Sequence, residues 1–246
     1  MISFIIPARN EQLYIADCIE SILKQGLKNP FEIVVVDNAS TDGTAAVVKK
    51  KFPNVILLRE EKLGTNQARQ KGFLHSGGEV LIFLDSDVRL PAGWLEKVLK
   101  KSNSDPGIVA ISAPYHFYDF PAYLQLANIM YVYLVSTPWQ FFIRNIARHS
   151  SFMIGGNMVI KRWALKKIEG FDTKFRFFGD DTDTGIRLGT VGKVVFSPRF
   201  WVYTSARRFN QRGVFRTMFT YLLNYTFVLF TKSPFQKTVA EYEEIR

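Results

Sequence analysis

The segment Val80-Leu81-Ile82-Phe83-Leu84-Asp85-Ser86-Asp87 decides the fold and also points to a site. Its five consecutive apolar residues have the length of a β-strand, and such a run is typical of a strand buried on both faces of a parallel sheet. The run ends at two carboxylates, Asp85 and Asp87. Because ligands of open α/β sheets bind at the carboxyl ends of the strands, the segment predicts a core strand with a polar cluster at its end.

The same arrangement recurs upstream of this segment. Apolar runs predict strands at Ile2–Ile6, Glu32–Val36 and Val55–Leu58, and helical patterns predict helices at Glu11–Gln25, Thr44–Lys51 and Asn66–His75. This alternation implies a parallel, doubly wound sheet with helices on both faces. The polar groups Arg9-Asn10-Glu11 and Asp37-Asn38 also follow strands, so we expect them on the same edge as Asp85-Ser86-Asp87.

The second half is less regular. It contains predicted strands at Ile108–Ala113, Met153–Ile160 and Lys193–Ser197, and predicted helices at Trp94–Lys101, Lys161–Ile168, Asp181–Leu188 and Val214–Phe230. No repeat or low-complexity tract divides the chain.

Composition bounds the kind of protein. The 246 residues are 47% hydrophobic and 22% charged, as in globular domains. The lone Cys18 excludes an internal disulfide, and Met1–Pro7 lacks the features of a secretory signal. We therefore expect a cytoplasmic protein.

The charge is uneven. The net charge is +10, and Thr184–Ala240 contains nine Lys or Arg residues and no acid. Such basic, aromatic sequence fits anionic lipid, a phosphorylated substrate or nucleic acid. No helix-turn-helix, zinc-finger or RNP-like pattern supports nucleic acid, so we expect no nucleic-acid partner.

Two apolar stretches raise the question of a membrane. Phe120–Ile143 is interrupted by polar residues and Pro138, and the fifteen residues Thr217–Thr231 fall short of the roughly 20 that a spanning helix needs. Two alternatives stay open: both stretches pack on the sheet, or they lie at a membrane interface.

Three polar segments carry candidate chemistry. Asp85 and Asp87 offer oxygen ligands to Mg²⁺ or Mn²⁺. Gly64 and Arg69 open a helix whose start suits a phosphate or a polar ring, with an ordinary surface helix as the alternative. Asp180, Asp181 and Asp183 either cap a helix or include a general base with a raised pKa. Three acids within four residues exceed what a cap requires.

Together these segments resemble the family 2 glycosyltransferases. The resemblance runs in order from Ile2 to about Arg208, and it is carried by Phe4–Glu11, Val35–Thr44, Gly64–Gly72, Phe83–Asp87 and Gly179–Asp183. It implies the GT-A fold, a Rossmann-like α/β fold with a doubly wound, mostly parallel sheet, helices on both faces and an α-rich C-terminal extension. The implied GT-A domain is 1–210, with a nucleotide-binding half 1–114 and an acceptor-side half 115–210. Residues 211–246 would form the helical extension, with membrane-interfacial placement as one alternative.

The resemblance also implies roles for single residues. Asp87 would hold Mn²⁺ or Mg²⁺, Asp181 matches the catalytic base, and Asp180 stands where a Glu is usual. Gly155-Gly156-Asn157 would border the donor sugar and the acceptor. The residues implied in nucleotide-sugar binding are Pro7, Ala8, Arg9, Glu11, Asp37, Gly64, Arg69, Asp85, Ser86 and Asp87.

One departure from the family pattern concerns the metal. Many relatives have a His after the last core strand, but Tyr203–Arg208 contains none. We hypothesise that Arg207 or Arg208 contacts the diphosphate instead; the alternative is a solvated basic turn.

The function implied is metal-dependent, inverting transfer of a sugar, of hexosyltransferase type, in the synthesis of glycans, polysaccharides or glycolipids of the cell envelope. The donor would be a UDP-, GDP- or dTDP-sugar. The acceptor would be a glycan or a lipid-linked saccharide, with peripheral contact at the inner face of the cell membrane as one option. The alternative is a non-catalytic nucleotide-sugar-binding or membrane-associated scaffold protein, which would not need Asp181.

Overall fold

The computed structural model describes residues 1–26, 30–138, 153–175 and 179–214, together with residues 216, 217, 220, 223 and 231. Its central element is a seven-stranded sheet in the order β3-β2-β1-β4-β7-β5-β8. The strands are β1 (Ile2–Ala8), β2 (Phe31–Asp37), β3 (Ile56–Arg59), β4 (Val80–Leu84), β5 (Ile108–Ser112), β7 (Asn157–Lys161) and β8 (Lys193–Phe196).

All neighbouring strands are parallel except β7, which runs antiparallel to both β4 and β5. The prediction of a mostly parallel α/β sheet is therefore confirmed. The strand predicted at Met153–Ile160 begins only at Asn157. Because of its reversed direction, β7 starts at the edge where β4 ends.

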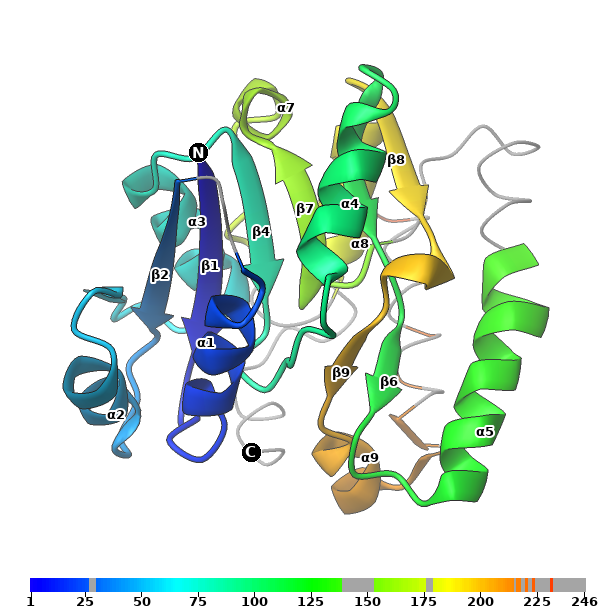
Figure 1. Ribbon diagram of the computed structural model, residues 1–246, viewed down its shortest axis with the longest axis horizontal. Coiled ribbons are helices and arrows are strands. Elements are labelled where there is room, and N and C mark those ends of the chain that lie inside the picture. The colour runs from blue at the N-terminus through cyan, green and yellow to red at the C-terminus, as the bar shows by residue number, and fades with distance from the viewer. Residues whose placement is uncertain are drawn as a thin grey trace.

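Helices cover both faces of the sheet (Figure 1). Side chains alternate along β1, so that Phe4 and Ile6 enter one hydrophobic cluster and Ile5 enters the other. The first cluster packs against α1 (Ile15–Leu23), α2 (Thr44–Lys51) and α4 (Trp94–Asn103). The second packs against α3 (Thr65–His75), α7 (Arg162–Lys167) and α8 (Asp180–Gly189).

The helix predicted at Glu11–Gln25 begins only at Ile15. Asn10 has a left-handed backbone, with φ of 54°. The N–H of Glu11 donates to the Thr44 hydroxyl at 2.7 Å, and that of Gln12 to Asp42 at 3.1 Å. These bonds hold the segment out of the helix, so Glu11 stays at the edge of the sheet.

A second, two-stranded sheet lies beside the main one (Figure 1). It pairs β6 (Tyr115–Phe117) with β9 (Val202–Thr204) in parallel, and the sequence did not predict it. Short helices surround it: α5 (Ala122–Tyr131), continued by the π-helical turn η1 (Val132–Ser136), the 3₁₀ turn η2 (Pro198–Phe200), and α9 (Arg207–Arg212). Arg89 and Tyr203 exchange two backbone hydrogen bonds, of 2.9 and 3.0 Å, which attach β9 to the segment after Asp87.

The predicted helix Val214–Phe230 and most of the extension 211–246 lie outside the described residues, so both stay predictions. Within the described part of the chain, none of the helices combines the length and the apolar character needed to cross a bilayer.

Candidate active site

The ends of β1, β2 and β4 lie on one edge of the sheet, where the start of β7 joins them. Leu84, the last residue of β4, pairs with Asn157, the first of β7. The N–H of Asp85 donates to the Gly156 carbonyl at 3.4 Å. The topology thus places Gly155–Asn157 beside Asp85–Asp87, although the two segments are about 70 positions apart.

Two glycines of this segment allow close approach. A Cβ at Gly155 would lie 2.5 Å from Nη2 of Arg69, and one at Gly156 would overlap the Asp85 carboxylate and the Tyr115 hydroxyl. Only glycine fits at either position without displacing a site residue. Asn157 behaves differently: its amide donates to the carbonyls of Ala113 at 3.2 Å and Phe200 at 3.0 Å, so it supports the sheet.

Arg69 is buried between two carboxylates. Its Nη1 donates to Asp180, and its Nη2 donates to Asp85 at 3.3 Å. The helix that carries it begins after Gly64, whose N–H donates to the Asn38 side chain at 2.9 Å. Arg69 therefore links the end of β4 to the start of α8, between residues for which the sequence implied donor and acceptor roles.

Asp181 differs from its acidic neighbours in its contacts. Asp180 pairs with Arg69, and Asp183 pairs with Arg187 at 2.8 Å. The contacts that the structure shows for the Asp181 carboxylate are the N–H groups of Gly155 (3.3 Å) and Thr182 (2.8 Å) and the Thr182 hydroxyl.

Burial raises the pKa of the Asp181 carboxylate to about 7, with a further rise from the charge of Asp180, while Arg69 opposes the rise. Burial also raises the pKa of Asp180, against the lowering influence of Arg69. A carboxylate that titrates near neutral pH suits proton abstraction from a hydroxyl. Asp181 is the acid of this cluster best placed for that role.

A second ion-paired group lies around Asp87. Arg207 donates to both carboxylate oxygens of the buried Glu11, at 2.5 and 2.9 Å, and its Nη2 lies 3.4 Å from Asp87. The Thr204 hydroxyl donates to the other oxygen of Asp87 at 3.1 Å. Burial raises the pKa of Asp87 to about 6; Arg207 opposes this rise, and Asp85 and Glu11 add to it.

The position of Arg207 depends on Asp119. This carboxylate accepts hydrogen bonds of 2.5 Å from the Ser205 hydroxyl and from the N–H of Ala206, immediately before α9. Phe209 then packs on Phe117 and Phe120, with ring centroids 5.1 and 5.7 Å apart. Arg208 is half-buried on the same helix.

The end of β2 forms a third group. Asp37 is buried, and its carboxylate accepts hydrogen bonds from Arg59 at 2.7 Å and from the N–H of Ser40 at 3.3 Å. Arg9 donates to the carbonyls of Asn38 and Ala39 at 3.1 and 3.0 Å and so shapes this loop. The other residues assigned to the nucleotide lie on the same edge: Pro7 and Ala8 at the end of β1, Gly64 before α3, and the buried Ser86.

Sequence reasoning missed four residues of the site: Arg59, Tyr115, Asp119 and Thr204. Arg59 ends β3, and Tyr115 follows β5 and donates to Asp85 at 3.3 Å, so the strand-end rule contained a signal for both. Burial raises the pKa of Tyr115 well above its ordinary value. Asp119 and Thr204 belong to no motif, because the small sheet that places them was not predicted.

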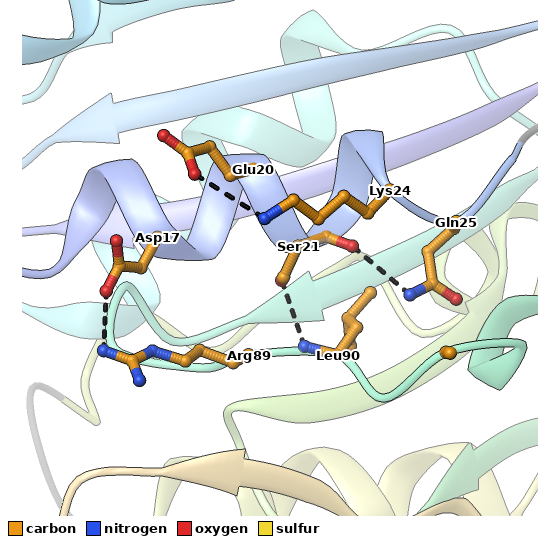
Figure 2. A pocket seen from close by; sticks show the side chains of 8 residues that line it. Asp17, Glu20, Ser21, Lys24, Gln25, Arg89 and Leu90 are labelled. Carbon is orange, nitrogen blue, oxygen red and sulfur yellow. Dashed lines mark hydrogen bonds and ion pairs between the residues drawn. The ribbon is translucent and has the colours of Figure 1, made fainter.

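A depression of about 400 Å³ lies elsewhere, between α1 and residues 89–92 (Figure 2). Its polar groups bond to one another: Arg89 to Asp17 at 2.6 Å, the N–H of Leu90 to Ser21 at 3.0 Å, and Lys24 to Glu20 at 3.8 Å. None of the carboxylates described above lines it, so we assign it no role in the site.

Among the described residues, no three His, Cys, Asp or Glu side chains are arranged to hold a metal ion by themselves.

Comparison with known proteins agrees with this architecture. The mannosyltransferase PcManGT from Pyrobaculum calidifontis, solved in complex with GDP-Man and Mn²⁺, matches with a TM-score of 0.70 over 99% of this chain and 67% of that chain, at 21% identity. Glucosyl-3-phosphoglycerate synthase from Mycobacterium tuberculosis, solved with Mn²⁺, UDP and phosphoglyceric acid, matches with a TM-score of 0.63 over 94% of this chain and 78% of that chain, at 16% identity. These likenesses establish the GT-A fold.

Curated relatives are similar in sequence over parts of their length. Glycosyltransferase AglE of Haloferax volcanii is 37% identical over 101 residues, which are 39% of this chain and 33% of AglE. An uncharacterized glycosyltransferase of Haemophilus influenzae is 29% identical over 184 residues, 73% of this chain and 59% of that protein. The chain thus spans between a third and three fifths of the length of these two relatives.

The family model described as Glycosyl transferase family 2 matches residues 3–169. The match includes Asp37, Asp85, Asp87 and Gly156 but ends before Asp181 and Arg207, so it does not bear on these last two residues. With the matched residues making up more than half of the sequence, the chain belongs to glycosyl transferase family 2.

Proposed function

We propose that this protein transfers a hexosyl group from a nucleotide-sugar to an acceptor hydroxyl, with inversion and with a divalent cation. The observation that carries this proposal is the position of Asp181. Its carboxylate, with a pKa near 7, adjoins Gly155, and Gly156 beside it touches Asp85 at the end of β4. Family membership supports the nucleotide-sugar as donor.

The reaction needs one base and one displacement. Asp181 accepts the proton of the acceptor hydroxyl, and that oxygen attacks the anomeric carbon from the side opposite the nucleotide. The bond between the anomeric carbon and the diphosphate oxygen breaks, and the nucleoside diphosphate leaves. Because attack and departure occur on opposite sides in a single step, the configuration inverts and no covalent enzyme intermediate forms.

The residues around Asp87 fit a hard divalent cation. Burial and, to a lesser extent, the nearby carboxylates of Asp85 and Glu11 raise the pKa of Asp87, and a bound cation would stabilise its ionised form. Asp87 would hold Mn²⁺ or Mg²⁺, which when bound supplies charge neutralisation to the diphosphate. The two solved enzymes described above contain Mn²⁺. Arg207, 3.4 Å from Asp87, adds a second positive group on the same side.

In this proposal the donor and the acceptor occupy different parts of the sheet edge. The nucleotide lies at the ends of β1 and β2, against Pro7, Ala8 and Asp37, and its base is that of UDP, GDP or dTDP. The acceptor, a glycan or a lipid-linked saccharide, approaches from the side of residues 115–210, where Asp180 and Asp181 stand.

The test is a donor screen with a matched variant. The protein is incubated with UDP-, GDP- and dTDP-hexoses, Mn²⁺ and a panel of glycan and lipid-linked saccharide acceptors, and the release of nucleoside diphosphate and the anomeric configuration of the product are measured. We expect one donor class to react, and Asp181→Asn to lose at least about 1000-fold in rate while the donor still raises its melting temperature. Equal turnover by Asp181→Asn would exclude the base assignment. Donor binding without turnover by either protein would favour the non-catalytic alternative.

A further inference from the structure

The helix formed by α5 and η1 has its polar side inward and its apolar side outward. Gln125 accepts a hydrogen bond of 3.0 Å from the N–H of Phe117, and Asn128 donates one of 2.9 Å to the Tyr115 carbonyl. Of the residues 122–136 only Val132 is buried. The helix is thus attached to β6 by hydrogen bonds to the β6 backbone, and Val132 is the one residue of the segment 122–136 that it buries.

The outward residues form a continuous stripe. Tyr123, Leu126, Met130 and Leu134 are spaced to lie along one side of the helix and are 70%, 59%, 51% and 68% exposed. Further exposed apolar side chains of the same segment widen it: Tyr131, Tyr133 and Val135. Figure 1 shows α5 at the margin of the molecule, beyond the small sheet. A contiguous apolar stripe of this kind marks a surface that another phase or molecule covers.

Charge identifies what covers it. The stretch Phe120–Ile143 contains no charged residue. Beside it, α9 packs through Phe209 on Phe117 and Phe120 and carries Arg208 and Arg212 in a part of the sequence, 184–240, that has no acid. An uncharged aromatic and aliphatic stripe next to a basic helix complements a bilayer with anionic headgroups. A second copy of the chain would instead bring positive charge against positive charge.

We propose that the stripe of α5 and η1 docks on the surface of an anionic lipid bilayer. The helix lies in the plane of the interface, its leucines and methionine enter the acyl boundary, and its tyrosines remain at the level of the headgroups. This proposal stands independently of the proposed function. If both hold, docking brings lipid-linked acceptors near the site, since Tyr115 bonds α5 through its carbonyl and Asp85 through its hydroxyl.

The experiment is co-sedimentation with vesicles of phosphatidylcholine alone and of phosphatidylcholine with 30% phosphatidylglycerol. We expect the protein to bind the anionic vesicles at low salt and to bind them more weakly at high salt. The double variant Leu126→Asp/Leu134→Asp is expected to lose at least tenfold in vesicle affinity. The matched control is Leu13→Asp/Leu74→Asp, because Leu13 and Leu74 are 76% and 65% exposed and lie outside the stripe. This control is expected to bind as wild type does.

Three results would overturn the proposal. They are no binding of wild type to anionic vesicles at low salt, equal loss in both double variants, and a wild-type dimer in light scattering that only the α5 variant dissociates. The melting temperature of each variant verifies folding. Turnover with a water-soluble acceptor distinguishes a failure of membrane docking from a failure of the proposed function. The α5 variant should lose vesicle binding and keep this turnover.

Discussion

Arg69 connects the two halves of the site. It lies in α3, yet it donates to Asp85 at the end of β4 and to Asp180 at the start of α8. A buried guanidinium with two carboxylate partners neutralises charges that would otherwise repel each other. The resemblance implies that Arg69 binds the nucleotide-sugar, which stays a prediction; its ion pairs with Asp85 and Asp180 lead us to propose that it also holds Asp180, and through it Asp181, against the donor edge.

Replacing Arg69 by Gln tests this role. The variant leaves Asp85 and Asp180 uncompensated, so we expect a loss of about 3 kcal/mol in the free energy of unfolding. We also expect the kinetic pKa of Asp181 to rise, because Arg69 lowers it in the wild type. Urea denaturation and the pH dependence of transfer measure the two effects. The control is Lys193→Gln, which removes a cation from the exposed pair with Asp105. A wild-type pH profile in Arg69→Gln would show that Arg69 does not influence the base.

The pH dependence of the wild type is a separate prediction. Asp181 must be ionised to accept a proton, and burial places its pKa at about 7. We therefore expect kcat/KM to rise with pH through neutrality and to level off above pH 8. At pH 5.5 it should fall roughly thirty-fold below the plateau. Initial rates in buffers of constant ionic strength measure the profile, and a profile that is flat from pH 5.5 to 8.5 would contradict the assignment of Asp181.

At this scale, sequence reasoning found the residues that follow apolar strands. Asp37, Asp85 and Asp87 directly follow such runs, and the topology places them on one edge. Sequence reasoning did not find the side chains that bond to these three carboxylates. Arg59 and Tyr115 also follow predicted strands, so the strand-end rule offered a signal for their place on this edge. Which carboxylate Arg59, Tyr115 or Thr204 bonds, however, depends on pairing between remote strands, which has no local signal.

At the scale of elements, α9 depends on an anchor in the small sheet. Asp119 binds the residues just before α9, and α9 presents Arg207 to Glu11 and Asp87. Arg207 thus lies where the sequence pattern lacked a metal-binding His, paired with Glu11 and Asp87, and its contact with the diphosphate stays a prediction.

Replacing Asp119 by Ala should release this arrangement. We expect a loss of about 1 kcal/mol in stability, as for a lost helix cap, and a rise of several-fold in the KM for the donor with little change in kcat. Steady-state kinetics compare the donor KM of Asp119→Ala with that of Arg207→Ala, which should raise this KM at least as much. The control is Asp105→Ala, an exposed acid bonded to Gly107 and Lys193. If Arg207→Ala raises KM and Asp119→Ala does not, Asp119 is not the anchor.

The predictability of elements follows from their length and burial. β1, β2 and β4 are long apolar runs, and α1 has a clear apolar face, so periodicity located these elements within a few residues. β6 and β9 have three residues each, too few to show a period. The reversal of β7 was also invisible, since an apolar run does not encode its direction.

At the scale of the whole molecule, the fold buries two acids, Asp87 and Asp181, in surroundings that disfavour the ionised carboxylate. Burial raises the pKa of Asp87 to about 6 and that of Asp181 to about 7, from an ordinary value near 4. At these two groups the folded protein therefore binds more protons than the unfolded chain between about pH 4 and pH 7. It follows from linkage that these two groups make the folded state less stable as pH rises through this window.

We therefore expect Asp181→Asn to be more stable than wild type, by on the order of 1 kcal/mol at pH 8, because the amide carries no charge to desolvate. The gain should shrink as pH falls towards 5, where Asp181 of the wild type is itself protonated. Urea denaturation of both proteins at pH 8, 6.5 and 5 measures the difference. His116, whose pKa burial lowers, destabilises both proteins equally on acidification below about pH 6.5 and so cancels in the comparison. A variant that is less stable than wild type at pH 8, or a gain that does not change with pH, would show that Asp181 is not held in an environment that opposes its charge.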